Sequence, residues 1–216
     1  YEVGKIIQAL DKKKLLDNTY IILTSDHGDY LGDHSLIGKA SFFDTAMRVP
    51  MLAMGPNIKP GQTVDDLVEV TDVTSTMLSW GNIDIPKWYD SRPLPGNGMP
   101  GNSGRDNIFG FLTDGWMNFD GRYKLHKYSN GEILLFDMKD DPEEQKNLIN
   151  NKDYQDIRNK LEDELSNEVM KSIDASMNDR LAQNGDMSQD PTFGFEGWQR
   201  PWPHPPKTKP AIYEKK

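Results

Sequence analysis

The chain has 216 residues and a mass of 24.6 kDa, enough for one large domain or two small ones and for a buried core. With 34 acidic and 25 basic residues its formal net charge is −9, so no nucleic-acid partner is expected, because phosphate binding needs a basic surface. No apolar run approaches the roughly 18 residues of a membrane span. The absence of cysteine excludes disulfides, thiolate metal ligands and a cysteine nucleophile.

The first elements along the chain indicate an α/β protein. Apolar residues repeat at the spacing of one helix face from Val3 to Leu10 and predict an amphipathic helix over residues 1–15. Residues 19–24 are rich in β-branched and apolar side chains, which is typical of a strand buried on both faces. Ligands of open α/β sheets bind beyond the carboxyl ends of such strands, so the residues after Thr24 are the first candidates for a site.

The α/β alternation continues in the middle of the chain. Residues 48–56 predict a short strand ended by a turn, and residues 70–80 predict a helix that is capped near Thr71 and stopped by Gly81. Residues 86–107 hold four prolines and four glycines, which is the composition of a long irregular loop. We expect a subdomain boundary in this loop.

The remaining residues predict a smaller unit. Strands are expected over residues 107–112, 123–128 and 133–136, the last two joined by an Asn-Gly hairpin turn, and together they predict an antiparallel sheet. Apolar spacing then predicts a helix over residues 154–173. The tail beyond Ser176 is rich in proline and tryptophan, and we expect it to wrap over a surface without a core of its own.

Ionisable residues are concentrated between residues 25 and 48. Asp26 and His27 directly follow the predicted buried strand and supply one carboxylate and one imidazole at one point. Hard divalent cations favour carboxylate oxygen, and imidazole is a less usual partner for calcium. Two ligands do not complete a metal site, and the pair also fits a turn that Asp26 caps with His27 packed beneath it.

Two motifs resemble one known family. The residues TSDHGDYLGDH at 24–34, followed by GK at 38–39, FFD at 42–44 and RVP at 48–50, resemble the second-half signature of the formylglycine-dependent sulfatases, members of the alkaline phosphatase superfamily. The residues LFDMKDDPEEQKNL at 135–148 are similar to a segment of that family's C-terminal subdomain. The resemblance covers roughly residues 1–150 in consistent order, which makes it more specific than either motif alone.

The resemblance implies an alkaline-phosphatase-like α/β sandwich with a mostly parallel central sheet, of which this chain holds part. Residues 1–106 would form the C-terminal half of the catalytic domain and carry the metal and sulfate-site residues. Residues 107–175 would form the small antiparallel sheet with its helix, and residues 176–216 a surface tail.

The resemblance also implies roles for the metal- and sulfate-binding residues. Asp26 and His27 would complete a site for one calcium ion whose other carboxylates come from earlier in the chain. Lys39 would contact the sulfate and its bridging oxygen. An ammonium and a divalent cation both neutralise charge that builds on the sulfate oxygens and on the departing alkoxide.

The other candidate residues leave alternatives open. His34 resembles a position near the leaving sugar, where it would donate a proton or a hydrogen bond, or serve a structural role. Arg48 would bind a substrate carboxylate or sulfate bidentately, or form a buried structural pair with Asp44 or another acid. His126 and His204 are expected to pack or to be solvated. The acidic segment Asp-Pro-Glu-Glu is expected to cap a turn.

The sequence departs from the family in one respect. Members attack sulfur with formylglycine made from Cys or Ser in a Cys/Ser-x-Pro-x-Arg motif, and these 216 residues contain no such motif. We therefore expect the C-terminal portion of a sulfuric ester hydrolase for a sulfated carbohydrate, inactive without an N-terminal sulfatase portion that carries formylglycine. A periplasmic or secreted location follows from family habit. The alternatives are a phosphonate or phosphate ester hydrolase of the superfamily and a noncatalytic binding module.

Overall fold

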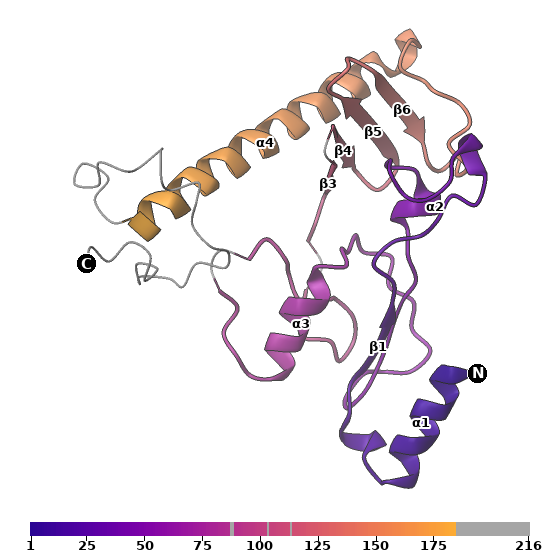
Figure 1. Cartoon of the computed structure of the whole chain (residues 1–216), viewed down its shortest axis with the longest axis vertical. Coiled ribbons are helices and arrows are strands. Elements are labelled where there is room, and N and C mark those ends of the chain that lie inside the picture. The colour runs from indigo at the N-terminus through magenta and orange to yellow at the C-terminus, as the bar shows by residue number, and fades with distance from the viewer. Residues whose placement is uncertain (87–88, 103, 113, 185–216) are drawn as a thin grey trace, which may run out of the picture. The chain divides into compact units, whose positions relative to one another are not determined.

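The computed structural model describes residues 1–86, 89–102, 104–112 and 114–184 of the chain (Figure 1). It divides into two compact units, Tyr1–Glu162 and Asp163–Lys216. No helix in the described part is long and apolar enough to cross a membrane. In chain order the helices and strands are α1 (Glu2–Lys12), β1 (Ile21–Thr24), α2 (Asp44–Met47), β2 (Met51–Met54), α3 (Asp72–Trp80), β3 (Ile108–Leu112), β4 (Gly115–Phe119), β5 (Tyr123–Tyr128), β6 (Ile133–Asp137) and α4 (Gln155–Asn184).

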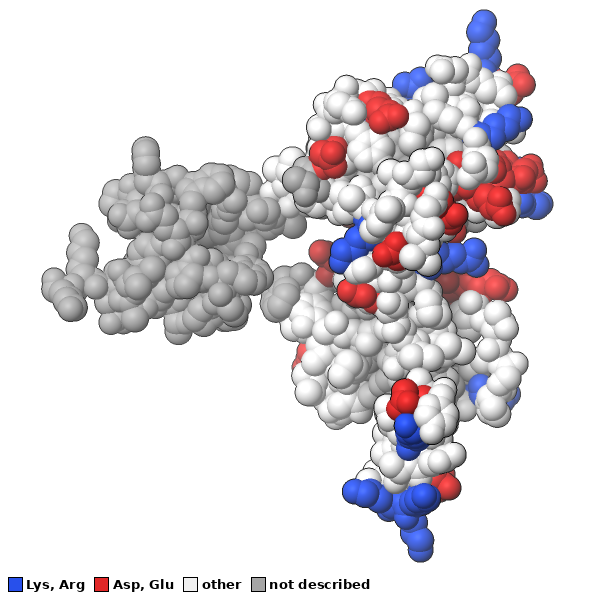
Figure 2. Space-filling view, turned by 45° about the vertical axis from the view of Figure 1, so that its right-hand side comes forward, with Lys and Arg blue, Asp and Glu red and all other residues white. Residues whose placement is uncertain are grey.

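The predicted N-terminal helix is confirmed as α1. Glu2 lies in its first turn and Lys12 in its last, an order of charge that complements the helix dipole. Three exposed lysines, residues 12–14, stand at its C-terminal end, which forms the basic lower end of Figure 2.

The strands β1 and β2 form a two-stranded sheet and run antiparallel, with Thr24 opposite Met51. Parallel neighbours need a crossover, usually a long helix. The connection here contains only the four-residue helix α2 and one short 3-10 helix, and it returns the chain alongside β1 in the opposite direction.

The burial of β1 differs from the expectation. The strand expected to be buried on both faces is only partly covered: Ile21, Ile22 and Thr24 are half-buried and Leu23 is exposed. Leu23 and Leu52 are directly opposite each other in the register and are 41% and 58% exposed. Ile21 and Met54 form the next pair on the same face, since side chains alternate along a strand. One apolar face of this sheet is therefore open in the described structure.

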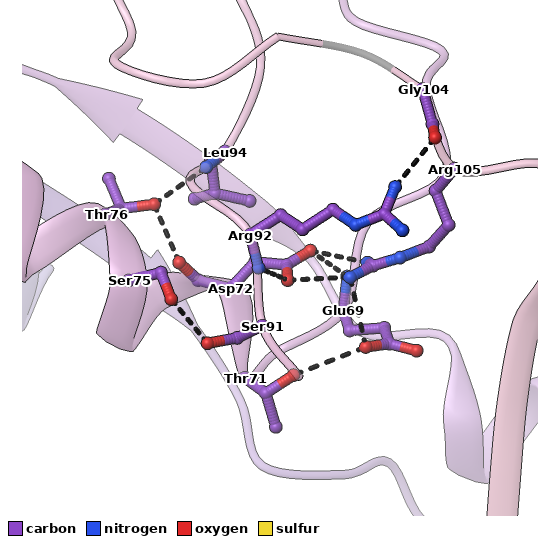
Figure 3. A network of polar contacts seen from close by, with 10 residues as sticks. All are labelled: Glu69, Thr71, Asp72, Ser75, Thr76, Ser91, Arg92, Leu94, Gly104 and Arg105. Atoms are coloured by element: carbon purple, nitrogen blue, oxygen red, sulfur yellow. Dashed lines mark hydrogen bonds and ion pairs between the residues drawn. The ribbon is translucent and has the colours of Figure 1, made fainter. Parts of the chain in front are cut away.

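The predicted helix α3 and the irregular loop after it are confirmed, and a buried polar network joins them (Figure 3). The Asp72 carboxylate accepts two hydrogen bonds from the Arg105 guanidinium, at 2.7 and 2.9 Å, and one from the Arg92 backbone N–H at 2.9 Å. The Thr76 hydroxyl accepts a hydrogen bond from the Leu94 N–H at 2.8 Å. A loop rich in proline and glycine is thus held to α3 by a few buried side chains.

The small antiparallel sheet is confirmed, with one strand more than expected. Its order is β3-β4-β5-β6, and β4 was not predicted because Gly115 and Asn118 lower its strand propensity. Asn118 is fully buried, and its side-chain amide donates a hydrogen bond to the Leu161 carbonyl of α4 at 3.0 Å. This tertiary contact satisfies a polar residue that the local pattern disfavours. The side chains of Leu125, Leu135 and Phe136 build the core of the sheet.

The helix α4 is longer than predicted. It begins at Gln155 and continues to Asn184, so residues 176–184, which were expected to belong to a surface tail, are part of this helix. Residues 185–216, including His204 and the tryptophans of the predicted tail, lie outside the described residues.

Candidate functional site

Asp26 and His27 lie directly after β1. The His27 N–H donates a hydrogen bond to Asp26 Oδ1 at 3.0 Å, and His27 Nδ1 lies 2.7 Å from the Gly28 carbonyl oxygen. Because a carbonyl oxygen only accepts, Nδ1 carries the proton and Nε2 keeps its lone pair. Nε2 in turn lies 3.3 Å from Asp26 Oδ2. One ring nitrogen is thus anchored on the backbone and the other lies beside a carboxylate, as is typical of a histidine that binds a metal ion.

Lys39 lies at the far end of the loop that follows His27, and its side chain returns to the His27 ring. The loop is closed by a hydrogen bond from the Tyr30 N–H to the Gly38 carbonyl at 2.9 Å, and the Lys39 ammonium contacts His27 Nε2. Desolvation raises the pKa of the Asp26 carboxyl. Hydrogen bonds from the backbone N–H groups of Asp26 and His27 and the charges of His27 and Lys39 outweigh it, so the pKa lies below its ordinary value.

The residues that follow β1 pack against α2. The Gly28 N–H donates a hydrogen bond to the Ala46 carbonyl at 2.8 Å, and a Cβ at Gly28 would lie 2.0 Å from the Thr45 carbonyl oxygen. Any side chain would force the two backbones apart. Gly28 therefore sets the position of His27 relative to α2.

His34 lies on the other side of the same loop. It adopts a left-handed backbone conformation with φ 52°, and its ring stacks on Phe43 at 3.8 Å between centroids and 7° between planes. It lines a cavity of about 340 Å³ together with residues of α2 and of the acidic turn near Glu144. The remaining lining residues are Asp33, Asp44, Thr45, Pro142, Glu143 and Gln145.

Arg48 pairs with Asp44, but at the surface and not in the buried pair that was expected. Its guanidinium Nη1 lies 3.8 Å from Asp44 Oδ2, and its side chain is 81% exposed. A surface pair of this kind contributes little to stability. Its contact with substrate stays a prediction.

The residues present fit a divalent cation in part. In the described ranges no three His, Cys, Asp or Glu side chains are grouped so that they could hold a metal ion. Asp26 and His27 offer a carboxylate and an imidazole nitrogen, which are ligand types that suit a cation whose other ligands come from elsewhere. The nitrogen, His27 Nε2, is contacted by the Lys39 ammonium in this structure. The metal and sulfate roles of Asp26, His27 and Lys39 stay predictions that this geometry accommodates.

A buried charged cluster near the site was not found from the sequence. Lys124 on β5 is 3% exposed, and its ammonium lies 2.5 Å from Asp44 Oδ1 and 2.8 Å from Glu144 Oε1. The Asp44 N–H donates to Glu144 Oε2 at 2.6 Å. The signal for this cluster in the sequence was a lysine at a core position of a predicted strand.

The expected turn-capping role is confirmed for Asp141, whose carboxylate accepts hydrogen bonds from two backbone N–H groups.

His126 packs beside this cluster, as expected for a structural histidine. It is fully buried, and its ring makes edge contacts with Phe42 and Phe43. Burial, together with the charges of Lys124 and His34, lowers the pKa of His126 to about 3. The imidazole is neutral at physiological pH.

A known family model matches the segment that holds the candidate residues. The Sulfatase family model matches residues 1–83, which include every one of the candidate metal and substrate residues. Arylsulfatase K of Xenopus laevis is 31% identical over 164 residues, a match that covers 68% of this chain and 31% of that protein. The chain thus spans about a third of the length of this curated relative.

Solved structures share the fold. BT1596, described as a 2-O GAG sulfatase, has a TM-score of 0.70 and 25% identity over 82% of this chain and 41% of its own. BT4656, solved with its substrate D-glucosamine-2-N,6-O-disulfate, has a TM-score of 0.69 and 24% identity over 80% and 38%. A phosphonate monoester hydrolase of Silicibacter pomeroyi has a TM-score of 0.63 and 24% identity over 82% and 38%.

The fold is the α/β fold of the alkaline-phosphatase-like enzymes. The chain belongs to the sulfatase family of that superfamily.

Proposed function

We propose that this chain supplies the cation- and sulfate-binding part of a sulfuric ester hydrolase that acts on a sulfated carbohydrate. The observation that carries the proposal is the meeting of Asp26, His27 and the Lys39 ammonium at the end of β1. The arylsulfatase relative and the two sulfatases among the structural neighbours support the reaction class. The disulfated glucosamine bound by one of them supports a carbohydrate substrate.

The reaction converts a sulfate ester and water into an alcohol and sulfate, and the chain's own residues would stabilise charge in it. Asp26, whose pKa lies below its ordinary value, is a carboxylate at neutral pH and would hold calcium together with His27 Nε2. Bound calcium would supply a Lewis acid for the sulfate oxygens. Lys39, whose ammonium contacts His27 Nε2 in this structure, would leave that nitrogen to the cation and bind the same oxygens.

His34 and Arg48 would serve the substrate beyond the sulfate. The His34 ring is held by Phe43 at the edge of a cavity large enough for part of a sugar, where it would donate to the leaving oxygen. Arg48 is exposed and would bind an acidic group of the substrate.

The nucleophile would come from a sulfatase segment outside these 216 residues. The sequence holds neither cysteine nor a Ser-x-Pro-x-Arg motif, and the chain spans about a third of the arylsulfatase that it matches. Formylglycine on that segment would supply the group that attacks sulfur. A periplasmic or secreted location belongs to the same proposal.

The proposal is tested with 4-nitrophenyl sulfate and a 6-O-sulfated glucosamine, using this chain alone and together with the segment that carries the nucleophile. We expect turnover only with both parts, loss of turnover on chelation of calcium, and a drop of about 10²- to 10³-fold for Lys39→Ala. Lys13→Ala, an exposed lysine beyond α1, is the matched control and keeps full activity. Turnover by the chain alone, or an unchanged Lys39→Ala variant, would refute the proposal.

A phosphonate or phosphate ester hydrolase is the second candidate. The phosphonate monoester hydrolase neighbour shares the fold, although its TM-score is lower than those of the two sulfatases. The same assay with a phenyl phosphonate monoester separates the two, since the preferred ester is the one with the higher kcat/KM. If the complete protein binds sulfated sugar and hydrolyses neither ester, it is a noncatalytic binding module.

A further inference from the structure

We propose that Glu144 is a positioning residue for the candidate site, acting through α2. The Glu144 side chain holds the first residue of α2, and α2 in turn supports both His27 and His34. The support of α2 by Glu144 stands on contacts alone. The expected effects of Glu144 on calcium affinity and on turnover rest on the proposed function.

The first link joins Glu144 to α2. Its Oε2 accepts a hydrogen bond from the Asp44 N–H at 2.6 Å, and its Oε1 lies 2.8 Å from the Lys124 ammonium, which also contacts Asp44 Oδ1 and the Phe42 carbonyl. The side chains of Glu144 and Lys124 are 2% and 3% exposed, so these contacts exchange little with water. No side chain of α2's own segment caps its first turn, and Glu144 supplies an acceptor from a hundred residues further along.

The second link joins α2 to the metal side of the site. The Ala46 carbonyl accepts the Gly28 N–H, and Gly28 packs against the Thr45 backbone with no room for a side chain. The Gly28 carbonyl is also the partner of His27 Nδ1. A shift of α2 would therefore move the group that orients the His27 ring and directs its Nε2.

The third link joins α2 to the substrate side. Phe43 directly precedes α2 and stacks on His34, and its ring is packed at 5.3 Å from the His126 ring and at 5.9 Å from the Phe136 ring. His126 and Phe136 belong to β5 and β6. The later part of the chain thus holds two groups. Glu144 holds the start of α2, and the sheet holds the ring of Phe43, on which His34 stacks.

The buried charges of this cluster favour a single placement of α2. The Lys124 ammonium faces two carboxylates, those of Asp44 and Glu144, and removing either one changes the net charge of this buried cluster. Burial raises the pKa of Glu144, while Lys124 and the Asp44 N–H oppose that rise. Residues that orient ligands in this way typically change affinity or activity about 10- to 100-fold when they are replaced.

The test compares Glu144→Ala with Glu132→Ala in the complete protein. Both variants remove one glutamate carboxylate, but Glu132 is exposed in the turn between β5 and β6 and lines no part of the His34 cavity, whereas Glu144 is buried against α2. Glu144→Gln keeps the volume and one acceptor oxygen, and it serves as the conservative variant and as the fallback if Glu144→Ala does not fold. Three quantities are measured well below the unfolding temperature: amide hydrogen exchange of residues 28 and 44–47, the Kd for calcium alone, and kcat and KM for 4-nitrophenyl sulfate.

We expect Glu144→Ala to speed exchange at Gly28 and α2 at least tenfold, to weaken calcium binding about tenfold and to lower kcat by a similar factor. Glu144→Gln recovers part of each effect, and Glu132→Ala shows none. A folded Glu144 variant with wild-type exchange and calcium affinity overturns the inference. If the wild-type protein hydrolyses no sulfate ester, the proposed function fails, while the exchange measurement still decides the positioning role.

Discussion

At the scale of single residues, buried charges distinguish this chain from an ordinary apolar core. Asp72 and Arg105 make a bidentate pair under the proline-rich loop, and Lys124 lies between two carboxylates under α2. Breaking a buried pair by removing one partner typically costs about 3–5 kcal/mol, because the remaining charge stays buried and unpaired. Each pair joins segments far apart in the sequence, so neither was visible as a local pattern.

His126 gives the clearest pH dependence. Its pKa falls from 6.5 to about 3 on folding through burial and the nearby charges of Lys124 and His34, with Glu144 Oε1 at 3.7 Å as the facing acid. The unfolded chain therefore binds a proton that the native protein does not, and this lowers the free energy of unfolding as pH falls from about 6.5 toward 3. Between pH 7 and pH 5 the loss from this residue is about 2 kcal/mol.

We expect His126→Leu to remove this contribution. Thermal unfolding followed from pH 7 to pH 5 would show a smaller decrease of the midpoint in the variant than in the wild type, even if the variant is less stable at pH 7. Equal pH slopes for the two proteins would contradict the assignment of a neutral, buried His126.

At the scale of elements, α2 is the small element on which the site depends. It has four residues, too few to be stable alone, and its position comes from β5, β6 and the acidic turn. The sequence motif includes residues on both sides of α2, but the motif does not reveal that α2 holds the site residues in place. Likewise β4 was missed, because Asn118 becomes acceptable in a strand only when α4 supplies its partner.

Gly28→Ala tests the contact between β1 and α2. The new Cβ would lie 2.0 Å from the Thr45 carbonyl oxygen, and a backbone atom cannot move aside as a flexible side chain does. We expect a loss of about 1–3 kcal/mol in the free energy of unfolding and weaker calcium binding. Urea denaturation and calorimetric titration with calcium measure the two effects.

Gly4→Ala is the matched control. Nothing lies within 4 Å of a Cβ at Gly4, which is in the helix α1, so the substitution should stabilise the protein by about 0.5–1 kcal/mol. A Gly28→Ala variant as stable as the wild type, with unchanged calcium affinity, would show that α2 and β1 are not tightly coupled.

At the scale of the whole molecule, charge and apolar surface are distributed unevenly. In Figure 2 acidic and basic side chains are interspersed over the upper part of the view, and basic ones predominate at its lower end. The sheet formed by β1 and β2 presents the pairs Leu23–Leu52 and Ile21–Met54 on one open face. Contiguous exposed apolar surface of this kind favours association with another surface.

The double variant Leu23→Thr with Leu52→Thr tests this face in the 216-residue chain. Threonine keeps the strand propensity, so the fold is retained. We expect lower binding of 1-anilinonaphthalene-8-sulfonate and less self-association in sedimentation velocity. Leu31→Thr with Ile37→Thr is the control, because those side chains are even more exposed but lie in the loop after β1. Equal dye binding by both variants would contradict a role for the sheet face.

The sequence by itself determined the family, most helices and strands, and the candidate residues Asp26, His27, His34, Lys39 and Arg48. These follow from short-range patterns, since a helix face, a hairpin turn and a sulfatase motif are each contained in a few tens of residues. The tertiary structure alone decided the antiparallel pairing of β1 with β2, the strand β4 and the support of α2 by Lys124 and Glu144. These depend on partners about 30 to 100 residues away, which local propensity does not encode.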